Sequence, residues 1–164
     1  MRGMRMMMIM GALGGLVAAD AYGQLAPPRQ SVDPGSPQSA ALSSQSAQAL
    51  VGGRPAEALR LADQAVATDV RNPWAHYDRA AALADLGRTD DALKEFKAAE
   101  ARFSTDDPWG RSVAMFGRAN LLAQAGRCAE AVAAFRDYAR FVEQKDPGGA
   151  ALARQQASAC QSPR

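Results

Sequence analysis

GRTDDAL, at residues 87–93, stands between two near-copies of itself, GRPAEAL at residues 53–59 and GRCAEAV at residues 126–132. The shared pattern is Gly-Arg-x-x-acid-Ala-aliphatic, and its glycine recurs after 34 and then after 39 residues. Self-similarity at such a period is typical of stacked helical repeats. Each copy places a glycine where one helix should end and an alanine where the next helix should pack closely. The repeat therefore predicts how the chain is built, and it says much less about what the chain binds.

Helix starts alternate with these glycines. A capping residue precedes a proline at four places, which are Ser36-Pro37, Asn72-Pro73, Asp107-Pro108 and Asp146-Pro147. This pair is a strong helix start, because a proline in the first helical position loses no hydrogen bond. We therefore expect a helix, a glycine turn and a second helix three times over, then a seventh helix over about residues 147–159, and no strand. The first helix of the third unit should be one turn longer than that of the second.

The chain resembles the tetratricopeptide repeat family over residues 39–160. A unit of that family has a small residue in its first helix, a turn glycine, and then an alanine, a bulky residue and another alanine in its second helix. The second unit supplies all of these, as Ala80, Gly87, Ala92, Phe96 and Ala99. The first and third units depart from the pattern, with Ala62 in place of the bulky residue and Tyr138 in place of the last alanine.

The resemblance implies an all-α solenoid of three helix-turn-helix repeats over residues 38–160, closed by a C-terminal capping helix. It also implies a protein or peptide partner, because repeats of this family serve as binding modules.

The start of the chain has the plan of a secretory signal peptide of the bacterial type over residues 1–21. Two arginines come first, an uncharged and mostly apolar run fills residues 6–19, and small residues follow. The alternative is an uncleaved membrane anchor, which needs about 20 apolar residues, more than this run has. We expect an exported protein, periplasmic or secreted, without stable membrane insertion after the signal is cleaved. Residues 22–37 should form a flexible linker and residues 161–164 a disordered tail.

Charge and composition exclude several classes of function. The formal net charge is +2, and it falls to +1 when the signal is removed, since 17 basic and 16 acidic residues remain. This balance favours neither a nucleic acid nor an anionic membrane as a partner. His76 has no nucleophile motif nearby and no second histidine to share a metal, so we expect it at the surface or partly packed. We find no enzyme here, and we expect no metal, no other cofactor and no small-molecule substrate.

The two cysteines, Cys128 and Cys160, are predicted to form a disulfide. In a helical stack each new first helix runs antiparallel to the helix before it, so the end of the seventh helix should lie near the start of the sixth. An exported protein with two cysteines so placed favours a bridge. That bridge would hold the last helix, which has a neighbour on one side only.

The predicted partner-binding surface is the concave face, which in this family is built from the first helix of each unit. Counting back from the turn glycines places four residues of the second unit there and the four matching residues of the third. The added turn puts Trp109 on the same stripe, and Asp78 and Asp85 should give the groove a mildly acidic edge. The candidate residues are Trp74, Tyr77, Asp78, Ala81, Asp85, Trp109, Val113, Phe116, Asn120 and Gln124.

Two alternatives stay open at this point. Trp74 and Trp109 each follow a helix-start proline, so these side chains either line a groove or seal the ends of helices. The function we expect is that of a non-enzymatic adaptor or scaffold in the cell envelope that binds a protein in its concave groove. The alternative is a structural protein that associates with further copies of itself.

Overall fold

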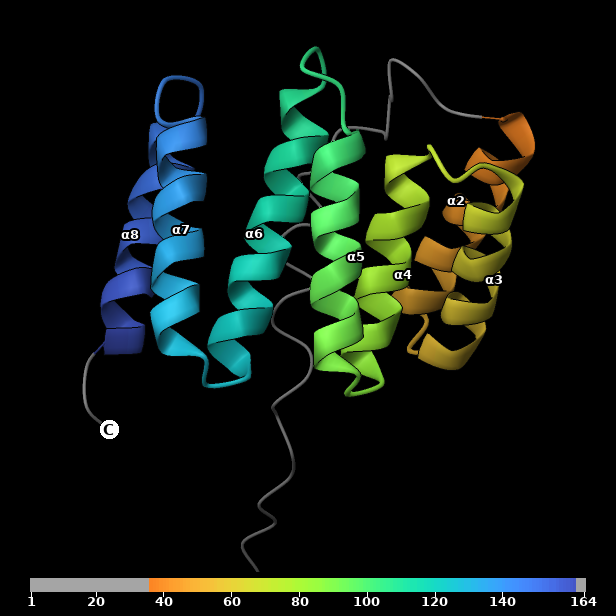
Figure 1. Ribbon diagram of the computed structural model, residues 1–164, viewed down its shortest axis with the longest axis horizontal. Coiled ribbons are helices and arrows are strands. Elements are labelled where there is room, and N and C mark those ends of the chain that lie inside the picture. The colour runs from red at the N-terminus through yellow and green to blue at the C-terminus, as the bar shows by residue number, and fades with distance from the viewer. Residues whose placement is uncertain (1–35, 162–164) are drawn as a thin grey trace, which may run out of the picture.

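Seven helices stand side by side in the computed structural model, which describes residues 36–161 (Figure 1). They are α2 (Pro37–Val51), α3 (Pro55–Thr68), α4 (Pro73–Asp85), α5 (Thr89–Arg102), α6 (Pro108–Gln124), α7 (Cys128–Val142) and α8 (Pro147–Gln161). The predicted signal peptide, most of the predicted linker and residues 162–164 lie outside the described residues. The helices begin at residue 37 and end at residue 161, one residue beyond the expected repeat domain at each end.

The predicted helix starts are confirmed, and each has its capping hydrogen bond. The side chain of Ser36 accepts a hydrogen bond from the backbone of Ser39, and Asn72 accepts from the backbone of two residues of α4. The carboxylates of Asp107 and Asp146 accept from glycine N–H groups three residues later, at 2.9 and 2.8 Å. These side chains satisfy N–H groups that the helices themselves cannot.

The turn glycines end the first helix of each unit, as predicted. Gly53, Gly87 and Gly126 have φ angles of 67°, 75° and 71°, in the left-handed region that glycine enters without a steric penalty. The arginine after each of these glycines pairs with the acidic residue three positions later, at 2.6 to 2.8 Å. This pairing explains why the Gly-Arg-x-x-acid pattern recurs, although exposed pairs of this kind add little stability.

Consecutive helices pack as antiparallel pairs, and the pairs stack into a solenoid (Figure 1). The pairs are α2–α3, α4–α5 and α6–α7, and α8 covers α7 at the end of the stack. Successive first helices also contact one another, α2 with α4 and α4 with α6, whereas successive second helices make fewer contacts. The face formed by α2, α4 and α6 is therefore the inner one. At 17 residues against 13, α6 is one turn longer than α4, as the sequence predicts.

The largest part of the core lies under the second and third units and α8. Phe135 is fully buried there, and Phe116 packs on it with a ring-centroid distance of 5.9 Å. A smaller cluster of Ala49, Ala58 and Leu61 holds the first unit. The predicted fold class is confirmed, since the described residues form an all-α helical-repeat solenoid without strands.

Serine hydroxyls, rather than large apolar side chains, fix the first helix in place. Ser39 Oγ donates to the carbonyl oxygen of Ala65, and Ser46 Oγ donates to that of Ala58, both at 2.8 Å. These small side chains let α2 approach α3 closely, and each buried hydroxyl of α2 has a partner.

The predicted disulfide joins the two ends that the stacking argument brings together. The Cα atoms of Cys128 and Cys160 lie 5.4 Å apart, and their sulfur atoms are bonded. The rest of the packing of α8 is modest, because its buried residues are Ala150, Ala153 and Ala157. Among residues 36–161, no helix is both long enough and apolar enough to cross a membrane.

Candidate protein-binding surface

The inner face carries two parallel rows of candidate residues, one on α4 and one on α6. Tyr77, Ala81 and Asp85 recur every four residues along α4, and Val113 follows Trp109 by four residues on α6. Residues at this spacing share one side of a helix. Because α4 contacts α6, the two rows belong to one surface.

Trp74 lies beneath this surface and does not line it. Its side chain is only 6% exposed, and it packs against three other rings. The ring centroids of Phe103, Trp109 and Tyr77 lie 5.0, 5.4 and 5.6 Å away. Trp74 therefore seals the junction between the start of α4, the end of α5 and the start of α6. Of the two roles considered for it, groove lining and sealing of helix ends, it has the second.

Phe116 and Asp78 are also buried. Phe116 packs on Tyr138 of α7 at 5.0 Å between ring centroids, so it belongs to the core. Asp78 does not form the expected acidic edge, because it is fully buried and accepts a hydrogen bond from Ser43 Oγ at 2.5 Å. This bond fixes α2 on α4, and it explains how a carboxylate is accommodated between helices.

The remaining candidates reach the solvent and define what we call the inner-face set. Its half-buried members are Tyr77, Ala81, Trp109, Val113 and Asn120, and its exposed members are Asp85 and Gln124. The set is aromatic and apolar near the start of α6 and polar near the turns at the other end. Desolvation by neighbouring groups raises the pKa of the Asp85 carboxyl above its ordinary value.

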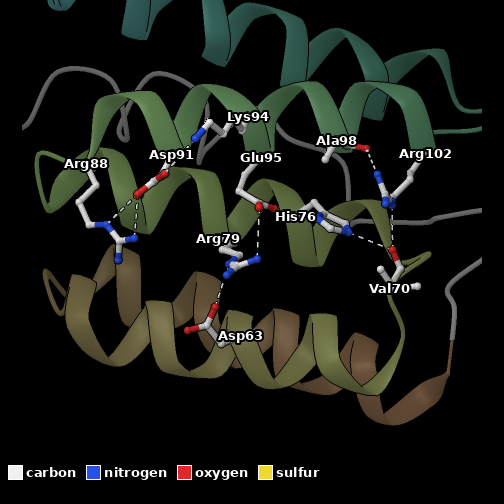
Figure 2. Close-up of polar contacts among 10 residues, drawn as sticks. All are labelled: Asp63, Val70, His76, Arg79, Arg88, Asp91, Lys94, Glu95, Ala98 and Arg102. Atoms are coloured by element: carbon white, nitrogen blue, oxygen red, sulfur yellow. Dashed lines mark hydrogen bonds and ion pairs between the residues drawn. The ribbon is translucent and has the colours of Figure 1, made fainter.

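A polar ladder, which we define as Asp63, Arg79 and Glu95, crosses the junction between the first two units (Figure 2). Arg79 of α4 lies 2.8 Å from the Asp63 carboxylate of α3 and 3.2 Å from the Glu95 carboxylate of α5. His76 Nδ1 lies 2.7 Å from a Glu95 oxygen, and His76 Nε2 lies 2.9 Å from the carbonyl oxygen of Val70. The ladder thus connects three helices, and His76 links it to the α3–α4 turn.

The place of His76 is a correction to what its sequence indicates. The sequence predicts a histidine that is at the surface or partly packed, but His76 is buried, with only 5% of the residue exposed. Its partner Glu95 lies 19 residues later in the sequence, on the facing helix, and nothing in the local sequence predicts that contact. The contact could have been predicted only from the register of α4 on α5, which places His76 and Glu95 on the same side of this helix pair.

Acid should weaken this ladder. Burial raises the pKa of Glu95, but the hydrogen bond from His76 and the charges of Arg79, His76 and Arg102 outweigh it and leave the pKa below its ordinary value of 4.5. A carboxyl whose pKa is depressed in the folded state stabilises the fold above the unfolded pKa, and this contribution is lost as the pH falls through the folded pKa.

We therefore predict that Glu95→Gln lowers the free energy of unfolding by about 1–3 kcal/mol at pH 7, and that the difference from wild type shrinks below about pH 4.5. Thermal melts between pH 7 and pH 3 measure this. Glu143→Gln is the matched control, because Glu143 is exposed and its one ion pair within residues 36–161 is with Arg154 on the neighbouring helix. A Glu95→Gln deficit that stays constant down to pH 3 would show that the loss comes from packing and not from charge.

Among residues 36–161, no group of three or more His, Cys, Asp or Glu residues is arranged to hold a metal ion. What the inner face offers is contact area and hydrogen-bonding groups, which are the properties of a binding surface.

Comparison with known proteins agrees with this architecture. The tetratricopeptide repeat family matches residues 49–115, which run from the end of α2 into α6. No curated protein matches the chain significantly. Repeats of this family generally mediate protein–protein interaction and are typically non-catalytic. Residues 49–115 are thus similar to tetratricopeptide repeats, and the helices on either side continue the same solenoid.

Proposed function

We propose that this protein is a non-enzymatic adaptor or scaffold of the cell envelope, and that it binds a protein partner with the inner-face set of α4 and α6. The observation that carries the proposal is the accessible row of Tyr77, Trp109 and Val113 on two adjacent helices. Aromatic side chains contribute much of the energy at protein interfaces, because they bury a large area at a small cost in entropy.

The buried residues under this surface support the proposal. Trp74 packs edge-on against Tyr77 and lies 5.4 Å from Trp109, measured between ring centroids. Tyr77 also packs on Phe96 of α5. Rings held in this way lose little freedom when a partner binds, and such preorganisation favours affinity.

Two features support an envelope location. The first 21 residues have the composition of a signal peptide. The bridge between Cys128 and Cys160 belongs to a class of bond that persists in oxidising compartments such as the periplasm and the extracellular space.

The test is affinity capture from an envelope extract with the full chain, carrying a C-terminal tag, as the bait. Trp109→Ala should lower the affinity for the captured protein at least about tenfold, because half-exposed aromatic anchors contribute strongly to binding. Leu152→Ala is the control, since Leu152 is an exposed apolar residue on α8, away from the inner face. The intact mass of the exported bait should correspond to a start between Asp20 and Leu25.

Three results would contradict the proposal in different ways. Equal capture by wild type and Trp109→Ala would show that the partner does not bind at the inner face. A bait that keeps residues 1–21 would contradict the proposed export with cleavage of the signal peptide. Light scattering that shows a dimer for the wild type and a monomer for Trp109→Ala would instead support a self-associating structural protein.

A further inference from the structure

The two junctions between repeats are built differently on the outer side of the solenoid. When the units are aligned by their turn glycines, Asp63 of the first unit corresponds to Lys97 of the second, 34 residues later. By the same alignment Arg79 corresponds to Arg118, and Glu95 corresponds to Ala134, each 39 residues later. At the second junction, Lys97 and Ala134 thus stand where the polar ladder of the first junction has its two carboxylates.

A hollow of about 540 Å³ lies where the ladder is missing. Its lining residues come from α5, α6 and α7 with the turn before it, and α6 stands between the other two helices in Figure 1. Leu93, Leu122 and Ala134 form its apolar floor, and all three are buried. The charged side chains that line it are Lys94, Lys97, Arg118, Arg127, Asp90, Glu130 and Asp137.

Of these charged side chains, Lys97 alone makes no ion pair within residues 36–161. Arg118 is held by Glu100 at 2.6 Å, and Arg127 is held by Asp90 and Glu130 at 2.8 and 2.7 Å. Lys94 pairs with Asp91, and Asp137 pairs with Arg140. The hydrogen bonds from Arg127, and more weakly the charge of Lys97, lower the pKa of Glu130. Within residues 36–161 the hollow therefore has one charged group without an ion pair, the Lys97 ammonium, above an aliphatic floor.

We propose that this outer hollow binds an acidic segment of a partner protein. A carboxylate of that segment takes the place that Glu95 fills at the first junction, between Lys97 and Arg118. An aliphatic side chain next to it packs on Leu93 and Leu122. The volume suits a few side chains, since ligand sites commonly measure about 300–1,000 Å³. This surface lies on the opposite side of α6 from the inner-face set, so it goes beyond the function proposed above.

The charges decide which occupant fits. The lining carries four cations and three anions, and the free group is a lysine. A basic or uncharged segment would leave Lys97 without a partner, whereas an acidic one completes the pattern that the first junction already shows. The attraction should weaken with salt, because exposed charges are screened over about 8 Å at physiological ionic strength.

The probe is a blocked octapeptide of alternating leucine and glutamate, compared with the same peptide carrying glutamine in place of glutamate. Each is titrated into the full chain at low salt while backbone amide shifts are followed by NMR. We expect the glutamate peptide to shift the amides of Lys97, Leu122 and Ala134 and to bind at least about fivefold more tightly than the glutamine peptide.

Three variants locate the effect. Lys97→Ala should weaken the binding of the glutamate peptide about fivefold. Lys145→Ala, which changes an exposed lysine in the turn between α7 and α8, should leave this binding unchanged. The double variant Lys97→Asp, Ala134→Glu rebuilds the carboxylates of the first junction around Arg118. It should abolish binding while the melting temperature is kept, which separates a blocked site from a misfolded protein.

Equal affinity for the two peptides, or no binding at all, would overturn the proposal. It would also be overturned if the shifted amides belonged to Tyr77, Val113 and the rest of the inner-face set. If sedimentation showed a dimer for the wild type and a monomer for the double variant, the occupant would be a second copy and not an acidic partner.

Discussion

Trp74→Ala should lower the free energy of unfolding by about 3–5 kcal/mol, which is the usual cost of truncating a buried aromatic residue. The side chain is 6% exposed and holds the rings of Tyr77, Phe103 and Trp109 together across three helices. Its loss leaves a cavity at a junction with little else to fill it. Urea denaturation followed by circular dichroism measures the change.

Trp109→Ala is the control for this prediction. Trp109 is half-buried, so its truncation should cost clearly less stability than that of Trp74. If the two variants lost the same amount, the distinction between a buried seal and an accessible binding residue would fail. A Trp74→Ala variant with unchanged stability would show that Trp74 does not hold the junction.

Reduction of the disulfide should have an effect of similar size. The bridge closes a loop with a sequence separation of 32 residues, and its removal should cost about 3–4 kcal/mol by chain entropy. The loss should appear first in α8, because the buried residues of that helix are alanines. Hydrogen exchange of the native and the reduced protein, together with thermal melts, measures both the size and the place of the change.

The double variant Cys128→Ser, Cys160→Ser is the control for the reducing agent. It should melt as the reduced wild type does, and it should not respond to further reductant. A wild-type melting temperature that is unaffected by reduction would show that α8 is held by its packing alone.

The sequence was sufficient to predict the parts of the fold that depend on local chemistry. Pairs such as Asn72-Pro73 start helices through the backbone and one side chain, and glycines such as Gly87 end them through a single φ angle. Both signals lie within a few residues of the feature that they predict. The pairing of Cys128 with Cys160 followed from the alternation of helix direction together with the expected export of the protein.

The parts that were not predicted depend on contacts between helices distant in sequence. Asp78 has the spacing of an accessible residue, but Ser43, which lies 35 residues earlier, covers it. Trp74 has the spacing of the inner-face residues, but the ring of Phe103, directly after α5, packs against it and helps to bury it. In both cases the burial of the side chain depends on a contact with a residue distant in sequence, which the repeat pattern does not encode.

Site-specific photo-crosslinking in intact cells tests the binding role of the inner face. A photoreactive residue replaces Gln124, a member of the inner-face set at the end of α6. The matched control position is Gln155 on α8, since both residues are exposed glutamines. We expect an adduct with a different protein from position 124 and none from position 155. No adduct from position 124, or an adduct from position 155 alone, would contradict a protein-binding role for the inner face.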